Sequence, residues 1–389
     1  MKKIDWRLVA IASGNFAHGS ATMGVIGLLN EIAADLDVSI ATAGQITTGM
    51  QLSAAIGAPL VAFFGGNLAR RTVLMLALLI TAGCQFAAAL APVYALLLVA
   101  RTLSGFGAAA YAPTAAATAA QLVEPEQRGR ALAAVFMGFA LASILGVPIG
   151  VWMGGLFGWR IAMAGFSVLA LLALLWVAAL VPGKLARGAG LERGAWAVVL
   201  KNRAIVAMIG FNLLHGSAQM LVFTYIAPLL RVALDAGPGT ISLVLGWIGL
   251  WSLIGSILAM QLTDRLGPAR MLGLGVAGMI AATAGWTAAS GSLPLMLLLL
   301  AVWGVSSMVV FIGVQAQIVH LDPRVAGVAL ALLLSTNFWG GVIGPALGGI
   351  LIASFGLSLL PWAGAAMYAC GALVLAVALR LARPRVAGV

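Results

Sequence analysis

Charge is what this sequence has least of. Charged residues make up 8% of its 389 residues, and hydrophobic residues make up 63%. Soluble domains usually carry about 25% charged residues, so this composition excludes an ordinary soluble protein. Runs of about 20 apolar residues are long enough to cross a bilayer as helices. We therefore predict an all-α integral membrane protein.

Residues that carry chemistry are also scarce. The two cysteines, Cys84 and Cys370, each stand alone in an apolar run, which is typical of buried small hydrophobic residues. The sequence has no nucleotide-binding loop, no metal-finger spacing and no Ser-His-acid set, so we expect neither an enzyme nor a cofactor. Its formal charge of +11 would suggest nucleic acid in a soluble protein, but the location of the cations indicates otherwise.

The apolar runs predict twelve membrane spans, near 7–29, 40–64, 72–92, 94–120, 129–153, 160–181, 204–230, 239–262, 269–289, 293–319, 325–353 and 359–380. If both termini are cytoplasmic, 18 of the 21 lysines and arginines fall in cytoplasmic segments, as the positive-inside rule requires. A miscount by one span would scramble the later loops. We therefore predict a multi-pass protein of the bacterial inner membrane with both termini cytoplasmic.

A nine-residue motif, N-x-x-H-G-S-A-x-M, occurs at 15–23 and again at 212–220, and it holds two of the only three histidines. On a helix, the first copy places Asn15, His18 and Thr22 within about 60° of one another, and the second does the same for Asn212, His215 and Gln219. A polar stripe repeated inside the membrane is where we expect the function to lie, with these six residues lining a cavity.

The repeat extends beyond this motif. At an offset of 198 residues, several glycines of the first half align with glycines of the second, among them Gly146 with Gly344. We predict an N-terminal six-helix bundle at 1–181, a cytoplasmic linker at 182–203 with a short surface helix, and a C-terminal six-helix bundle at 204–389. Parallel repeats of this kind indicate alternating access about a central site.

The two histidines are candidate proton carriers. Each lies eleven residues into its span, which is roughly 16 Å deep and near the middle of a ~30 Å hydrocarbon core. Histidine is the one side chain with an unperturbed pKa near ambient pH, and all ten acidic residues fall in loops or at span ends. The alternative is that each histidine is neutral, bonds to Asn15 or Asn212, and serves only packing.

Two further interpretations concern metal and charge. Thioether and imidazole groups suit Cu(I), so the alternative metal site consists of His18, Met23, His215 and Met220. A spacing of five places His and Met about 140° apart on one helix, so chelation needs ligands from both halves. Arg101 is the only cation within a span, and it must meet water, a carbonyl group or an anion.

Over essentially its full length the chain resembles the major facilitator superfamily, and within it the drug:proton antiporter-1 branch that includes the arabinose-efflux-like permeases. The resemblance is carried by several motifs. These are Arg101-Thr102-Leu103-Ser104-Gly105-Phe106-Gly107 (motif B), Gly138…Gly146-Val147-Pro148-Ile149-Gly150…Gly154 (motif C) with Gly158-Trp159-Arg160 after it, Asp264-Arg265-Leu266-Gly267 with Arg270 (motif A), and the seventh-span signature Phe223-Thr224-Tyr225-Ile226-Ala227-Pro228.

The resemblance implies two pseudo-symmetric six-helix bundles around a cavity lined by spans one, four, seven and ten. It places Tyr111, Tyr225 and Gln315 near substrate, Arg101 near the coupling machinery, and Asp264, Arg265 and Arg270 in the cytoplasmic latch. Two departures stand out. Gly66 replaces the acid of the first motif A, and no carboxylate lies inside the first spans.

These observations predict a monomeric secondary transporter that exports a drug-like molecule, sugar or nucleoside in exchange for protons. The first alternative is an uptake transporter for Cu(I) or for a small anionic metabolite attracted by Arg101. The second is a non-transporting membrane sensor or scaffold, which is disfavoured because the sequence offers no soluble domain to pass on a signal. Its expected partners are a small-molecule substrate, protons and the lipid bilayer, and no nucleic acid.

Overall fold

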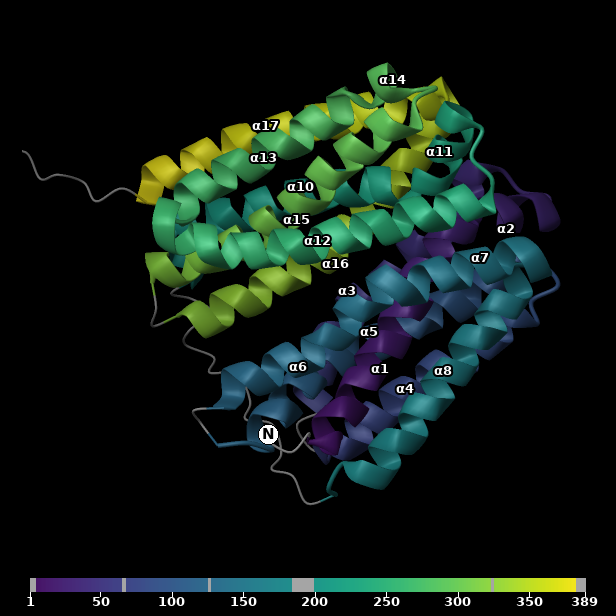
Figure 1. Cartoon of the computed structure of the whole chain (residues 1–389). Helices are drawn as coiled ribbons and strands as arrows, with labels where there is room; N and C mark the ends of the chain where they lie inside the picture. Colours follow the sequence, from purple (N-terminus) through teal and green to yellow (C-terminus); the bar gives the residue numbers. More distant parts are fainter. Residues whose placement is uncertain (1–4, 65–67, 125–126, 184–198, 323–324, 383–389) are drawn as a thin grey trace, which may run out of the picture. The chain divides into compact units, whose positions relative to one another are not determined.

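The chain folds as a set of long helices (Figure 1). A computed structural model describes residues 5–382 apart from 65–67, 125–126, 184–198 and 323–324, and this part contains no strand. Its helices form twelve consecutive segments, each matching one predicted span. The twelve-span all-α fold predicted from the apolar runs is therefore confirmed.

Six segments make up the first half. They are α1 (Trp6–Met23) continued by η1 (Gly24–Leu28) and α2 (Leu29–Asp35), α3 (Ile40–Phe64), α4 (Arg70–Ala89), α5 (Tyr94–Gln121), α6 (Arg128–Leu141) continued by the π-turn η4 (Ala142–Gly146) and α7 (Val147–Phe157), and α8 (Trp159–Leu180). The first segment runs to Asp35 rather than ending near 29. Hydropathy marks where a helix leaves the apolar core, and a helix can continue beyond that point.

Six segments also make up the second half. They are α10 (Arg203–Thr224) with α11 (Ile226–Leu234), α12 (Pro238–Leu266), α13 (Pro268–Ala284) with α14 (Trp286–Ala289), α15 (Leu293–Leu321), α16 (Ala326–Phe355), and η5 (Leu357–Leu359) with α17 (Leu360–Ala382). Proline stands in the first turn of α12, α13 and α15, where its missing N–H has no helical partner to lose.

Rare backbone conformations recur at the spacing of the sequence repeat. Asp37 and Asp235 lie 198 residues apart and have φ angles of 49° and 50°, the only positive values among non-glycine residues in the described ranges. Gly158 and Gly356 are also 198 residues apart, with φ angles of 92° and 84°. Since non-glycine residues seldom adopt positive φ, this match shows that the two halves repeat one backbone plan.

By internal packing the chain divides into two compact units. One contains Met1–Gly190 and Thr224–Gly249, and the other contains Leu191–Phe223 and Leu250–Val389. Within the first unit, the Ser242 hydroxyl of α12 donates to the Pro148 carbonyl at 2.7 Å, and Arg231 of α11 forms a 3.3 Å ion pair with Glu31. The start of the second half thus packs with the first. The domain boundaries 1–181, 182–203 and 204–389 stay a prediction, and most of the expected linker lies outside the described residues.

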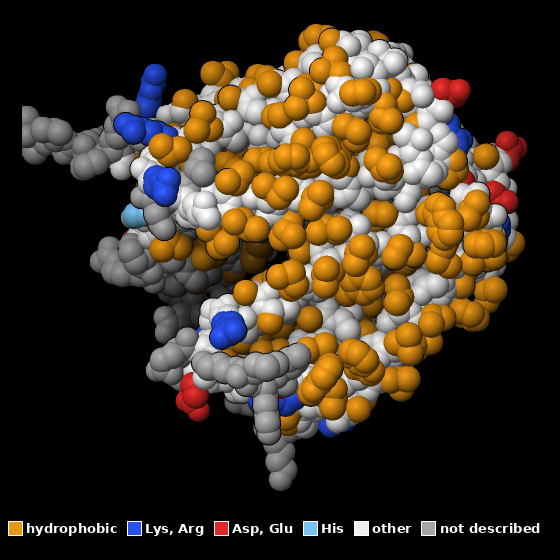
Figure 2. All heavy atoms as spheres, in the orientation of Figure 1, with side chains coloured by type: hydrophobic (Ala, Val, Ile, Leu, Met, Phe, Trp, Pro, Cys, Tyr) orange, Lys and Arg blue, Asp and Glu red, His pale blue; other side chains and the backbone are white. Residues whose placement is uncertain are grey.

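The helix surfaces suit a lipid environment. Nine helical runs of the described chain have the length and apolar composition to cross a membrane on their own. Large hydrophobic side chains are widely exposed, among them Leu90 (65%), Phe355 (69%) and Leu373 (70%). Figure 2 shows hydrophobic side chains spread over the helix faces, with charged side chains gathered at helix ends. In water such faces would be costly, whereas lipid tails match them.

Candidate functional site

His18 lies in the interior of the first bundle. Its Nδ1 atom is 3.2 Å from the Thr81 hydroxyl of α4, and that hydroxyl donates its single hydrogen to the Ala77 carbonyl at 2.9 Å. With that donation in place, the Thr81 hydroxyl accepts from His18, and Nδ1 carries the hydrogen of the neutral ring. In the neutral ring this leaves Nε2 as the nitrogen that can take up a proton.

Arg101 of α5 ties four spans of the first bundle together. Its Nη1 donates to the Ala21 carbonyl at 3.1 Å and to the Gln85 side-chain oxygen at 3.2 Å, while Gln85 donates to the same Ala21 carbonyl at 3.0 Å. Its Nη2 contacts the Met50 sulfur at 3.0 Å. Arg101 is 2% exposed, and no carboxylate in the described ranges pairs with it. Neutral dipoles thus hold this buried cation.

His215 lies in the interior of the second bundle among aromatic rings. The centroid of its ring is 5.7 Å from that of Phe211 in α10 and 5.2 Å from that of Tyr368 in α17. The side chain is buried, and its Nδ1 has no hydrogen-bond partner. The repeat therefore places one buried histidine in each half, but gives them different neighbours.

The repeated asparagines anchor helices. The Asn15 amide donates to the Val135 carbonyl of α6 at 2.9 Å, and the Asn212 amide donates to the Leu333 carbonyl of α16 at 3.1 Å and to two side-chain oxygens of the same helix. Neither asparagine bonds to the histidine of its own motif. The alternative in which an Asn–His bond explains both residues is therefore wrong, although packing does explain the asparagines.

The Gly–Ser part of the motif also serves helix packing. A Cβ atom on Gly146 would lie 1.9 Å from the Ser20 hydroxyl, and one on Gly344 would lie 2.4 Å from the Ser217 carbonyl oxygen. Each serine hydroxyl donates to the carbonyl four residues earlier in its own helix. Glycine on the facing helix is what permits this close approach, so helix packing explains the repeated serines.

The aromatic candidates for substrate contact are fully buried. The Tyr111 hydroxyl donates to the Ile11 carbonyl at 2.9 Å, and its ring stacks on His18 with 6.4 Å between centroids. Tyr225 belongs to the first packing unit, where its hydroxyl lies 3.4 Å from the Gln45 amide nitrogen. Both rings are covered in this conformation, and their role in substrate binding stays a prediction.

The remaining candidates are less enclosed. Thr22, Gln219 and Gln315 are half-buried, and Gln315 donates to the carbonyl of Phe311 in its own helix at 3.1 Å. Arg265 and Arg270 are exposed at the turn between α12 and α13, while Gly66 and the Asp264 side chain lie outside the described part of the structure. The cytoplasmic latch stays a prediction.

The alternative metal ligands show only ordinary contacts. Met23 and Met220 are half-buried, and the Met23 sulfur lies 3.7 Å from the Ser143 hydroxyl. Among the described residues no group of three or more His, Cys, Asp or Glu side chains is arranged to hold a metal ion. The thioether site with ligands from both halves stays a prediction.

Sequence reasoning missed four residues, of which Thr81 and Tyr368 contact the histidines, Gln85 contacts Arg101, and Trp303 neighbours Tyr368. Thr81 and Gln85 are four residues apart, so they share one face of α4, and this spacing in an apolar run is a signal that could have found them. Tyr368 and Trp303 gave no comparable signal, because single aromatic residues are common in apolar helices.

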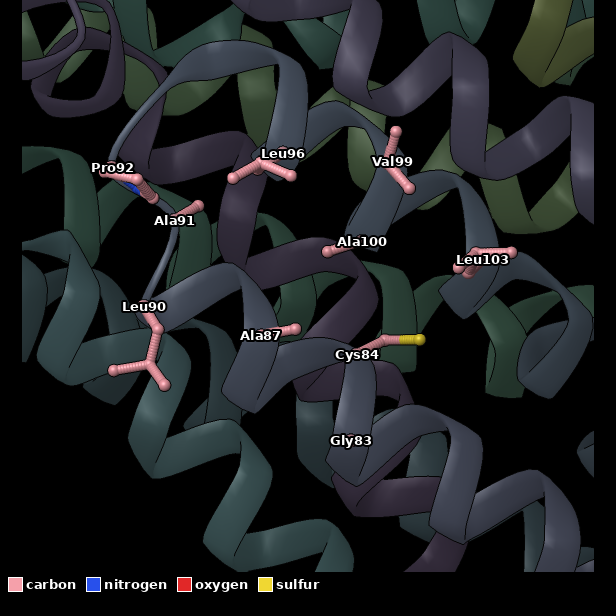
Figure 3. A pocket seen from close by; sticks show the side chains of 10 residues that line it. All are labelled: Gly83, Cys84, Ala87, Leu90, Ala91, Pro92, Leu96, Val99, Ala100 and Leu103. Atoms are coloured by element: carbon pink, nitrogen blue, oxygen red, sulfur yellow. The ribbon is translucent and has the colours of Figure 1, made fainter.

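A separate groove of about 420 Å³ opens between α4 and α5 (Figure 3). It is lined by apolar side chains and by the thiol of Cys84, and Leu90 and Val99 at its edge are 65% and 54% exposed. None of the predicted site residues lines it. Its exposed apolar rim places it on a lipid-facing surface of the first bundle.

Comparison with known proteins decides the family. The model of the Major Facilitator Superfamily matches residues 11–333 and 212–389. The chain belongs to the major facilitator superfamily. Members of this superfamily are transporters, so membrane transport by a multi-pass helical protein is the activity that membership supports.

Proteins related in sequence align with most of this chain. The inner membrane transport protein YdhP of Escherichia coli O157:H7 is 30% identical over 93% of both chains. A chloramphenicol resistance protein of Streptomyces lividans is 31% identical over 72% of this chain and 71% of its own. The crystal structure of the nucleoside transporter NupG shares the fold with a TM-score of 0.79 at 14% identity, and the match covers 97% of this chain and 100% of that one.

Proposed function

We propose that this transporter exports a small organic solute, of a drug-like, sugar or nucleoside kind, in exchange for protons. It acts as a monomer in a bacterial inner membrane, with both termini in the cytoplasm. Export of a drug-like solute is supported by the relative named for chloramphenicol resistance. The positions of the lysines and arginines support the orientation.

Proton coupling rests on one observation, which is that each half buries a single histidine at the same place in its first span. Coupling needs a group that changes charge inside the membrane. The described carboxylates lie at helix ends and turns, and Arg101 remains charged. These carboxylates belong to Asp5, Glu31, Asp35, Asp37, Glu124, Asp235 and Asp322. His18 and His215 are then the leading proton carriers.

The test is transport into proteoliposomes with chloramphenicol as the first probe, with and without an imposed pH gradient. We expect the double variant His18→Gln/His215→Gln to lose accumulation driven by the gradient, while exchange without a gradient continues. Glutamine keeps a hydrogen-bonding group of similar length but does not titrate. His320→Gln is the matched control, because His320 is exposed near the end of α15.

Gradient-driven accumulation by the double variant at the level of the parent protein would show that the histidines are structural. If chloramphenicol is not carried, thermal unfolding in the presence of other drugs, sugars, nucleosides and Cu(I) identifies the probe to use, because a ligand that binds only the folded state raises its stability. Stabilisation by Cu(I) alone would favour the uptake alternative.

A further inference from the structure

In the second bundle, the buried polar atoms without hydrogen-bond partners include three on neighbouring aromatic side chains. They are His215 Nδ1 on α10, the Trp303 indole nitrogen on α15 and the Tyr368 hydroxyl on α17. Their side chains are only 5%, 4% and 1% exposed. Buried polar groups are almost always hydrogen-bonded, to protein or to ordered water, so three such atoms require an explanation.

The three side chains belong to one cluster. The rings of His215 and Tyr368 are 5.2 Å apart between centroids, and the Trp303 side chain is a direct neighbour of Tyr368. Phe211 and Phe223 close the cluster on the side of α10, where Phe223 stacks on Trp303 at 5.7 Å. Aromatic surfaces thus surround the polar atoms.

The chemistry of these atoms matches a water molecule. An indole N–H only donates, a phenol hydroxyl both donates and accepts, and histidine Nδ1 does either according to its tautomer. A water can accept from Trp303, exchange a hydrogen bond with Tyr368 and donate to His215. A buried water usually makes about three such bonds.

We propose that His215, Trp303 and Tyr368 hold a water molecule inside the second bundle, and that this water passes the transported proton to and from His215 Nδ1. The second part rests on the proposed function. In the forward step a protonated water gives one hydrogen to Nδ1, and a neutral water and an imidazolium remain. The reverse step returns that hydrogen to the water.

No charged side chain of the described residues enters this cluster. Tyr368 is the titratable neighbour. Asn337 of α16 faces Gly216, which follows His215 in the sequence, and Thr283 of α13 faces Gly364 of α17. The charged side chains described on the helices of the second half lie toward their ends, at Arg203, Arg231, Arg265, Arg270 and Arg380, with Asp235 and Asp322 directly after two of these helices. His18 differs, because Thr81 already satisfies its Nδ1.

The experiment is NMR on protein labelled with ¹⁵N in histidine alone and reconstituted in lipid bilayers. With three histidines in the chain, the signals can be assigned with His18→Gln, His215→Gln and His320→Gln. We expect rapid magnetisation transfer from water to His215 Nδ1, and loss of that transfer in Tyr368→Phe/Trp303→Phe. Phe211→Leu is the control, because it changes a neighbouring ring and leaves all three polar atoms in place.

Absence of water transfer to His215 Nδ1 in the parent protein, or its persistence in the double variant, would overturn the water site. The role of the water in proton transfer is tested by transport in proteoliposomes with Tyr368→Phe, which keeps the aromatic ring and removes the hydroxyl. This single variant also replaces the double variant if the double variant does not fold. Loss of gradient-driven accumulation, with exchange retained, supports this proton-transfer role. Unchanged gradient-driven accumulation in a variant without bound water overturns it. The NMR result decides the water site even if the transporter proves not to be proton-coupled.

Discussion

The two halves are alike where helices pack and different where histidines are held. Asn15 and Asn212 bind equivalent carbonyls on the fifth segment of each half, and glycines on those segments face the repeated serines. His18, in contrast, bonds to Thr81, while His215 has aromatic neighbours and an unpartnered Nδ1. A duplicated sequence can therefore keep one packing plan while the chemistry of its two halves diverges.

The largest difference is Arg101, which has no counterpart in the second half. The corresponding helix α15 contains no lysine or arginine, and its matching positions are leucines. We expect Arg101→Leu to lower the stability of the first unit strongly, because a buried hydrogen bond to a charged group contributes about 1.5–3 kcal/mol and the Gln85 side-chain oxygen loses its donor. Thermal unfolding of the purified protein measures the loss.

Arg101→Lys sharpens this test. Lysine keeps the charge but presents a single ammonium group, so it cannot reach the Ala21 carbonyl and the Gln85 oxygen in the geometry of the guanidinium fork. We expect an intermediate loss of stability. Stability equal to that of the parent in both variants would mean that the guanidinium contacts contribute nothing to the bundle.

Much of the fold followed from the sequence, because composition and loop charge are strong signals in a membrane protein. Twelve spans were predicted from apolar runs, and the helices follow them closely. The finer packing was not predictable in this way. The boundary between packing units falls inside α12, between Gly249 and Leu250, and no change in composition marks it.

The candidate site was predicted only in part. The repeated motif marks His18 and His215 as candidates because histidine is so rare here, and their role stays a prediction. The structure adds that the amides of Asn15 and Asn212 donate to helix carbonyls. Whether a residue lines a cavity or packs inside a bundle depends on the direction of its side chain. The spacing of residues along one helix does not show which other helix their side chains contact. Tyr368 could not be assigned to His215 for this reason, since 153 residues separate them (368 − 215).

The facing glycines should differ in a smaller but measurable way. A methyl group on Gly344 meets backbone atoms, with the Ser217 oxygen at 2.4 Å and the Leu221 nitrogen at 2.7 Å, whereas one on Gly146 first meets the Ser20 hydroxyl at 1.9 Å. A hydroxyl can rotate away and a helix backbone cannot. Overpacking costs about 1–3 kcal/mol, so we expect Gly344→Ala to lower the unfolding temperature more than Gly146→Ala.

A second substitution distinguishes the two causes. Removing the hydroxyl with Ser20→Ala should restore part of the stability lost in Gly146→Ala. Ser217→Ala should restore none in Gly344→Ala, because the obstructing atoms are backbone. Equal rescue in both halves would show that the close approach is made by side chains in both.

The turn before the sixth segment differs between the halves in its polar contacts. Gly158 and Gly356 both start this turn with positive φ, but Trp159 and Arg160 follow the first and Leu357 and Ser358 follow the second. The Trp159 indole donates to the Asp35 carboxylate at 3.1 Å, and Arg160 forms an ion pair with the same group. Only the first of these two turns is tied to the end of the first segment in this way.

This contact predicts the smallest effect, a pH dependence confined to the first half. Hydrogen bonds from Arg160 and then Trp159 lower the pKa of Asp35 below its usual value. The stabilisation is therefore complete above the unfolded pKa of about 3.9 and is lost as pH falls through the lower folded value. The Arg160 and Asp35 side chains are 38% and 45% exposed, so we expect at most about 1 kcal/mol from their ion pair, which salt reduces further. Asp35→Asn should lower the unfolding temperature slightly at neutral pH and not below the folded pKa, whereas Asp37→Asn, at a neighbouring acid, should show no such difference. A gap between Asp35→Asn and the parent that persists in acid would show that the carboxylate charge is not what stabilises this turn.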